Sequence, residues 1–199
     1  MNDHYFSSRP TAEGRQRTVR FSAWGHDIEL ETSSGVFAAD GLDKATAILL
    51  RRTEPPPAGS TVLDLGCGWG PIACALAVAS PDATVWATDV NERAVELTRR
   101  NAESLGVEIH VEMPSDVPPG LTFDVIWSNP PIRIGKAALH SLLLEWLPRL
   151  HPDGRAFLVV GKNLGADSLQ RWLTEHGWPT DRVASEQGFR VLVVHTPRV

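Results

Sequence analysis

The residues with the clearest chemical potential are Asn129, Pro130 and Pro131, which follow an apolar run at 123–127. The run has the pattern of a buried strand. The prolines end it, because proline has no backbone N–H and disfavours helical backbone in the residue before it. Asn129 is therefore expected at a rigid strand end, with its side-chain amide and the neighbouring carbonyls facing a crevice. Oxygens placed in this way can accept hydrogen bonds from an exocyclic amine.

A glycine-rich loop, 66–70, follows a second apolar strand and precedes a small-residue helix that begins at Pro71. Glycines let the backbone turn sharply and let a ligand approach it, and the strand–loop–helix context is typical of a cofactor loop. Pro71 stands where a dinucleotide fingerprint has its third glycine, which favours a cofactor without phosphates. Asp89 ends the next strand, where it can bind a ribose diol. With Asn129, the loop predicts an enzyme that alkylates a planar amine.

Strand and helix patterns alternate along the chain. Strands are expected at 18–21, 26–31, 61–65, 83–88, 107–111, 123–128, 155–160, 182–185 and 189–195, and helices at 42–49, 71–79, 91–105, 139–150 and 166–176. Repeated strand–helix units predict an α/β fold, a parallel sheet covered on both faces with its ligand at the carboxyl ends of the strands. Three residues join the last two strands, so that pair is expected to be antiparallel.

Composition favours one compact unit, with 199 residues of which 42% are hydrophobic and 22% charged. The proline-rich stretch at 55–59 is the best boundary, dividing a hairpin-and-helix appendage (1–57) from a cofactor-binding domain (58–199). Neither a signal peptide nor a membrane span is evident, which favours the cytoplasm. Cys67 and Cys74 are expected to be structural thiols, and no metal site is expected because the cysteines and histidines lack ligand spacing.

The net charge of −5 shows that the chain as a whole is not basic, unlike most nucleic-acid-binding domains, so that any basic patch is local. A basic stretch lies near the N-terminus, with arginines at positions 9, 15, 17 and 20. A nucleic-acid substrate would therefore require binding surface from a partner or from a second copy of the chain.

Together these motifs resemble the class I S-adenosylmethionine-dependent methyltransferases, which have a Rossmann-like fold with a seven-stranded, mostly parallel sheet and a terminal antiparallel hairpin. Within that class the chain resembles the small-domain group of ribosomal RNA guanine-N2 methyltransferases, because the similarity extends to residues 35–43, 161–168 and 187–192. The resemblance implies S-adenosyl-L-methionine as cofactor. It implies ribosomal RNA or the assembling small ribosomal subunit as partner, no membrane, and a monomer or homodimer.

The resemblance also implies a role for each residue of the two motifs. The cofactor would contact Asp64, Gly66, Gly68, Gly70, Asp89, Val90, Asp116 and Asn129, with Asp64 and the loop at the methionine part, Asp89 at the ribose, and Val90 and Asp116 at the adenine. Asn129 and the Pro130 carbonyl would hold the acceptor amine. The substrate would contact Phe37, Pro131, Ile132, Arg133 and Lys136.

Ile132 departs from the family pattern, in which an aromatic residue follows Asn-Pro-Pro and stacks on the target base. Stacking would then come from Phe37 or Trp69, or be replaced by aliphatic contact. The departure leaves the acceptor open, so three functions compete: a ribosomal RNA guanine-N2 methyltransferase, a protein glutamine or DNA adenine methyltransferase, and a catalytically silent RNA-binding or assembly module. Intact Asp89 and Asn129 argue against the silent module.

Overall fold

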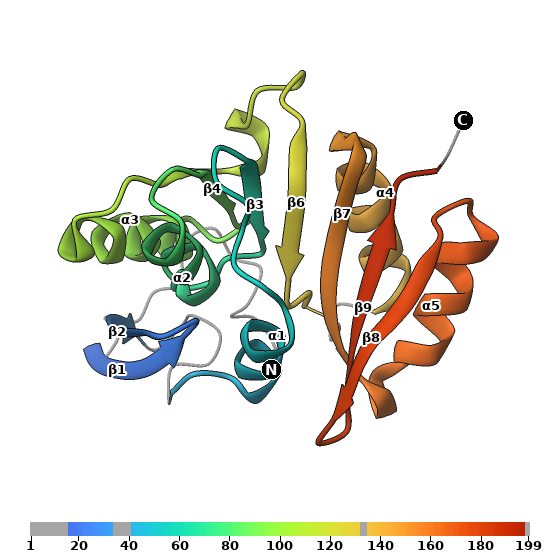
Figure 1. Ribbon diagram of the computed structural model, residues 1–199, viewed down its shortest axis with the longest axis horizontal. Helices are drawn as coiled ribbons and strands as arrows, with labels where there is room; N and C mark the ends of the chain where they lie inside the picture. Colours follow the sequence, from blue (N-terminus) through green and yellow to red (C-terminus); the bar gives the residue numbers. More distant parts are fainter. Residues whose placement is uncertain (1–15, 34–40, 132–134, 198–199) are drawn as a thin grey trace.

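A computed structural model describes residues 16–33, 41–131 and 135–197 (Figure 1). Phe37, Ile132 and Arg133 lie outside these ranges. The strands are β1 (Gln16–Ala23), β2 (His26–Ser33), β3 (Thr61–Leu65), β4 (Thr84–Thr88), β5 (His110–Glu112), β6 (Phe123–Ser128), β7 (Leu150–Gly161), β8 (Thr180–Glu186) and β9 (Phe189–His195). The helices are α1 (Lys44–Arg52), α2 (Pro71–Ala79), α3 (Glu92–Leu105), α4 (Lys136–Trp146) and α5 (Ala166–Glu175), with short 3-10 turns η1 (Pro114–Asp116), η3 (Leu147–Arg149) and η4 (Lys162–Leu164).

The seven-stranded sheet has the strand order β5-β4-β3-β6-β7-β9-β8. Strands β3 to β7 are parallel, whereas β9 is antiparallel to both of its neighbours, β7 and β8. The predicted mostly parallel sheet with a terminal antiparallel hairpin is confirmed. The strand order reverses between β3 and β6, which places the glycine loop and Asn129 at the switch point where such sheets bind ligands.

Both hairpins close through two-residue turns. Residues 24 and 25 have φ values of 48° and 84°, and residues 187 and 188 have 47° and 84°. Positive φ at both central positions defines the type I′ turn, whose twist matches the twist of the flanking strands. The glycine of each pair, Gly25 and Gly188, adopts this backbone without steric cost.

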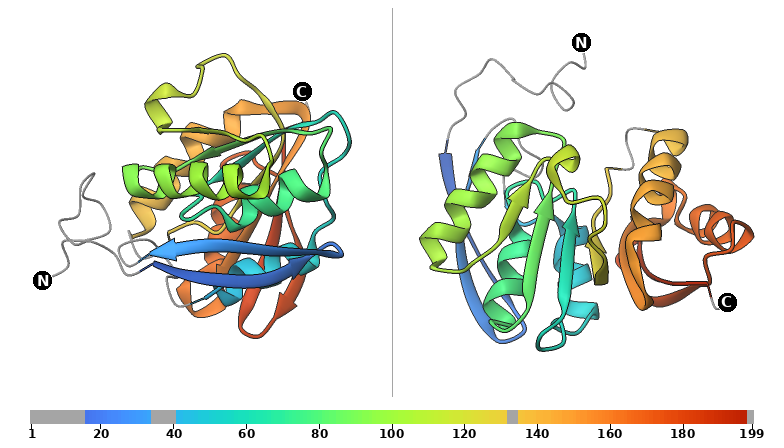
Figure 2. Two further views of the ribbon diagram at one scale, coloured as in Figure 1. Left: turned by 90° about the vertical axis from the view of Figure 1, so that its left-hand side faces the viewer. Right: turned by 90° about the horizontal axis from the view of Figure 1, so that it is seen from above.

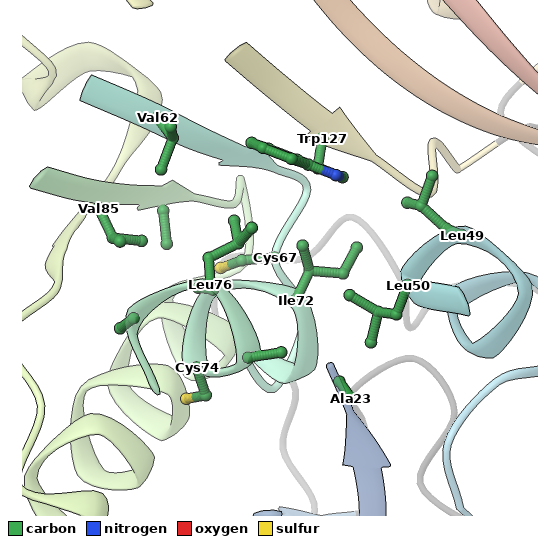
Figure 3. Packing of buried hydrophobic residues seen from close by; sticks show 14 of the residues in the cluster. Ala23, Leu49, Leu50, Val62, Cys67, Ile72, Cys74, Leu76, Val85 and Trp127 are labelled. Carbon is green, nitrogen blue, oxygen red and sulfur yellow. The ribbon is translucent and has the colours of Figure 1, made fainter. Parts of the chain in front are cut away.

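The core consists of two hydrophobic clusters, one on each face of the large sheet. Adjacent strand residues face opposite ways: Val62 and Val125 pack with α1, α2 and α3, while Leu63 and Ile126 pack with α4 and α5. In Figure 3, Trp127 of β6 points toward α1 and α2. Its indole N–H donates to Thr53 Oγ1 at 3.2 Å, which fixes the end of α1 against β6.

The β1–β2 hairpin is a separate two-stranded sheet that packs on α2 and α3, away from α4 and α5 (Figure 2). Buried Asn101 of α3 holds it there. The Asn101 side chain donates to the carbonyls of Glu31 (2.9 Å) and Trp69 (2.8 Å) and accepts from the Glu31 N–H (2.9 Å). One side chain thus joins the hairpin to the glycine loop.

Two predicted strands start three or more residues away from the expected position, whereas the others start within two residues of it. β5 starts three residues later than expected because Gly106 and Val107 complete the end of α3: their N–H groups donate to the carbonyls of Glu103 and Ala102. This paired pattern is a Schellman motif. β7 starts at Leu150, five residues earlier than expected, and its pairing with β6 shifts register between Phe123 and Val125. An irregularity of this kind bends the strand locally. Residues 152–154, Pro-Asp-Gly, have the composition of a turn, so no strand pattern is evident in the sequence before Arg155.

Candidate active site

The glycine loop turns back on itself at the carboxyl end of β3. Gly66, Gly68 and Gly70 have φ values of 79°, 59° and 85°, in the left-handed region that favours glycine. The N–H groups of Gly66 and Cys67 both donate to the Thr88 carbonyl, at 2.9 and 3.0 Å. A Cβ at position 70 would lie 2.7 Å from Thr98 Cγ2, so at this position glycine is also required by packing.

Asp64, one residue before the end of β3, carries a fully buried carboxyl group. Its Oδ2 accepts from the Ala73 N–H at 2.9 Å, and its Oδ1 has no hydrogen-bond partner among the described residues. Burial raises the pKa of Asp64 to about 8; the Ala73 hydrogen bond acts in the opposite direction, and the charge of Asp89 adds to the rise. A buried oxygen without a donor is costly unless a ligand supplies one.

The raised pKa predicts that the cofactor-free protein loses stability as the pH rises. A carboxyl with a folded-state pKa near 8, against 3.8 ordinarily, binds its proton more tightly when folded. Its contribution is therefore fully present below pH 3.8 and is lost as the pH rises toward 8, by at most about 1.4 kcal/mol per pH unit. Denaturant unfolding of the protein and of Asp64→Asn between pH 5 and 8.5 measures this term. Equal slopes for the two proteins would show that Asp64 is ionised throughout.

Asp89 follows β4 and faces the glycine loop. Its two oxygens accept from the N–H groups of Gly68 (3.0 Å) and Asn91 (2.9 Å). Burial raises its pKa, while these hydrogen bonds and one from Val90 act in the opposite direction. Val90, the next residue, is 51% exposed although it is apolar, and Asp116 is exposed in η1 after β5. The three residues follow adjacent parallel strands, so they share one edge of the sheet.

Asn129 immediately follows β6 and lies beside the same loop. A Cβ on Gly66 would lie 4.0 Å from Cδ of Pro131, so the two motifs come within van der Waals distance. The Asn129 amide nitrogen donates to Asp43 Oδ2 at 2.8 Å and to Thr46 Oγ1 at 3.0 Å. With both amide hydrogens engaged, Oδ1 is left as the free acceptor, and no donor from the described residues is bonded to it.

Asp43 and Thr46 are site residues that the sequence analysis missed. Asp43 is the N-cap of α1, and its Oδ2 also accepts from the backbone N–H groups of Ala45 (2.9 Å) and Thr46 (3.3 Å). An aspartate just before a helical pattern does signal a cap. Nothing local signals its contact with Asn129, which lies 86 residues further along the chain.

The structure corrects one expectation about the acceptor pocket. Trp69 was a candidate for stacking on the target base, yet it is 1% exposed and packs edge-on against Phe21, with ring centroids 6.4 Å apart. A buried indole cannot stack on an incoming base, so this expectation is wrong. Pro130 is buried, Pro131 is half-buried, and Lys136 is exposed at the start of α4.

Cys67 and Cys74 are both buried and lie on opposite sides of α2 (Figure 3). Burial raises the pKa of both thiols, so neither is a ready nucleophile. We expect Cys67→Ala and Cys74→Ala, singly and together, to keep methyl transfer within a few-fold of the parent. Steady-state kinetics at a temperature below the unfolding transition checks this. A complete loss of activity with intact folding would instead indicate thiol catalysis.

Within the part of the chain that the structure describes, no cluster of His, Cys, Asp or Glu side chains could hold a metal ion. None of the described helices is long and apolar enough to cross a membrane. Three features of the site point to a ligand: the open backbone at Gly66, the unpartnered oxygen of Asp64 and the carboxylate of Asp89. They fit a nucleoside carrying an amino-acid part, as S-adenosylmethionine does.

The chain is similar to several known proteins. The chain is 33% identical over 196 residues to the uncharacterized protein YbxB of Bacillus subtilis, covering 96% of this chain and 98% of that protein. It is 40% identical over 141 residues to ribosomal RNA small subunit methyltransferase C of Serratia proteamaculans, covering 68% of this chain and 40% of that protein. The chain therefore spans less than half the length of that curated relative.

The fold matches that of the T. thermophilus 16S rRNA N2 G1207 methyltransferase, solved in complex with AdoMet and guanosine. The TM-score is 0.76 at 21% sequence identity, over 94% of this chain and 52% of that one. Residues 27–193 match the family described as "Methyltransferase small domain". By this match, which covers most of the chain, the chain belongs to the methyltransferase small domain family and is an S-adenosylmethionine-dependent methyltransferase.

Proposed function

We propose that the chain methylates an exocyclic amino group, and that its acceptor is guanine N2 of small-subunit ribosomal RNA. The observation that carries the proposal is the orientation of Asn129, whose Oδ1 is left free at the switch point of the sheet while both amide hydrogens are bound by Asp43 and Thr46. A free amide oxygen can accept from an amine N–H. Relatives named as ribosomal RNA small subunit methyltransferases support the choice of RNA.

The bound cofactor would supply a methyl group on a sulfonium, which the amine takes as its lone pair forms the N–C bond and the C–S bond breaks. The chain's residues then have to hold and orient the reacting groups. An aromatic amine is a weak nucleophile because its lone pair is delocalised into the ring. Asn129 Oδ1 and the Pro130 carbonyl would accept hydrogen bonds from the two amine hydrogens. These bonds favour a pyramidal nitrogen and hold its lone pair in line with the methyl group. The methylated nitrogen is briefly cationic, and its proton can leave to water without a strong base.

The cofactor-binding roles follow the same geometry. The free oxygen of Asp64 and the open loop at Gly66 would take the methionine part, and Asp89 would accept from the ribose hydroxyls. The exposed side chain of Val90 would lie against the adenine, with Asp116 at its amine. The exposed Lys136, together with Phe37, Ile132 and Arg133, would contact the RNA. Under this proposal the enzyme acts in the cytoplasm, where it methylates either free RNA or the assembling subunit.

The test is methyl transfer from labelled S-adenosylmethionine to unmodified 16S rRNA, to small subunits, to total protein and to DNA, followed by nucleoside and amino-acid analysis. We expect label in N2-methylguanosine. Label in adenine or glutamine would assign the other amine acceptors. Absence of transfer to every substrate, with cofactor binding intact, would contradict the proposal.

A further inference from the structure

We propose that Asp43 and Thr46 are positioning residues for methyl transfer: they set the rate by fixing the side-chain amide of Asn129, so that the segment before the glycine loop completes the acceptor site. The inference rests on the function proposed above for Asn129. Its basis is the pair of hydrogen bonds from one amide nitrogen to two acceptors, at 2.8 and 3.0 Å.

The Asp43 carboxylate, which can only accept, decides which way the amide faces, and Thr46 adds a second acceptor. The amide group of an asparagine can rotate by 180° about the Cβ–Cγ bond, which exchanges the positions of Oδ1 and Nδ2. Here the exchange would place Oδ1 of Asn129 against the Asp43 carboxylate and the Thr46 hydroxyl oxygen. Both N–H donations would be lost. The Thr46 hydroxyl could turn and donate to Oδ1, but the Asp43 carboxylate, which only accepts, would face an oxygen at hydrogen-bond distance. Oδ1 is therefore held on the side away from α1, where an amine can reach it.

The carboxylate contributes charge as well as direction. A donor that is bound to an ionised acceptor makes a stronger bond than one bound to a neutral acceptor. Hydrogen bonds in series polarise one another, so the Asp43 bond makes Oδ1 of Asn129 a better acceptor. This effect grows during the reaction, because the acceptor amine becomes cationic as the N–C bond forms. Asp43 thus stabilises the cationic amine that forms during methyl transfer, although it contacts neither the amine nor the methyl group.

Helix α1 is held in place at its other end too, which gives the arrangement its rigidity. Thr53 Oγ1 accepts a hydrogen bond from the indole N–H of Trp127. The Thr53 carbonyl accepts from the indole N–H of Trp24 at 2.7 Å. Arg51 and Arg52 pair with Glu186 at the end of β8. α1 is thus bonded at one end to Asn129, just after β6, and at the other end to Trp127 of that strand. Figure 1 shows α1 beside the end of β6. A helix fixed at both ends can orient a side chain.

Two pairs of variants separate orientation from folding. Thr46→Val keeps the shape of the side chain but removes the hydroxyl acceptor, and Thr46→Ser restores it. Asp43→Ser keeps a helix cap but is too short to reach Asn129, whereas Asp43→Asn keeps an acceptor for all three bonds. Thr53→Val is the matched control, because it removes a hydroxyl that bonds β6 from the opposite end of the same helix, without contact to Asn129.

The measurements are the single-turnover rate on unmodified 16S rRNA and small subunits at saturating cofactor, the dissociation constant for S-adenosylmethionine, and the unfolding midpoint. Thr46→Val is expected to slow transfer about 5-fold, and Asp43→Ser about 10- to 100-fold, with cofactor affinity unchanged. Thr46→Ser should recover most of the rate, and Asp43→Asn only part of it, because asparagine keeps the acceptor but not the charge. Thr53→Val should lower the midpoint but slow transfer less than Thr46→Val does, because Thr53 has no bond to Asn129. Rates that follow the midpoint in all variants, Thr53→Val included, would overturn the inference.

A second readout needs no turnover. The two side-chain N–H signals of Asn129, assigned by their absence in Asn129→Ala, are expected to exchange slowly with water in the parent and quickly in Thr46→Val and Asp43→Ser. Unchanged exchange in both variants would overturn the inference. If the parent methylates none of the RNAs, the acceptor proposed above is wrong, while these signals still decide whether Asp43 and Thr46 orient Asn129.

Discussion

Asn129→Ala is expected to slow methyl transfer by about 100-fold or more while leaving S-adenosylmethionine affinity close to that of the parent. The substitution removes Oδ1, which is the acceptor left free by Asp43 and Thr46. Without it the amine is misoriented, and misplaced reacting groups cost on the order of 100-fold in rate. Single-turnover transfer to ribosomal RNA and calorimetric titration of the cofactor measure the two quantities separately.

Asn129→Asp is the informative companion to that variant. It keeps an acceptor toward the amine but brings a second carboxylate to the Asp43 carboxylate, with no amide hydrogens between them. We expect partial activity that increases at lower pH, where one of the two carboxyls takes up a proton. Preserved transfer in Asn129→Ala, or a loss that follows weaker cofactor binding, would show that Asn129 does not position the amine.

Asp89→Ala should weaken S-adenosylmethionine binding by about 1.5–3 kcal/mol, which corresponds to a roughly 10- to 150-fold rise in the dissociation constant. The substitution removes the proposed acceptor for the ribose hydroxyls. It also removes the bond that holds the Gly68 N–H at 3.0 Å, so loop order contributes to the effect. Calorimetry with the cofactor and with its demethylated product measures the change.

Thr98→Val separates the two contributions to the Asp89 effect. Thr98 Oγ1 donates to the Gly68 carbonyl at 3.1 Å from beneath the loop, and its side chain is fully buried. The valine loosens the loop without touching the ribose site, so a smaller loss of affinity is expected. Equal losses in Thr98→Val and Asp89→Ala would assign the whole effect to the loop and remove the ribose contact.

The order of elements and the edge on which the ligand binds could be predicted from the sequence. Strand and helix patterns, the I′ turns and the glycine that ends α3 depend on backbone preferences and hydrogen bonds between residues a few positions apart. Asp89 and Asn129 each end a strand, and in a parallel sheet those ends meet at one edge. Both therefore lie where the sequence placed them.

Only the tertiary structure decided how the site residues act on one another. Asp43 reads locally as a helix cap, and its contact with Asn129 exists because α1 packs across the end of β6. From its position in the glycine loop, Trp69 is expected to be available for stacking on a ligand, but Phe21 of the β1–β2 hairpin packs against it. The shifted pKa of Asp64 follows from burial beneath α2 and from the nearby charge of Asp89. Burial and contacts between residues far apart in sequence depend on how layers pack, and local pattern carries no signal of that packing.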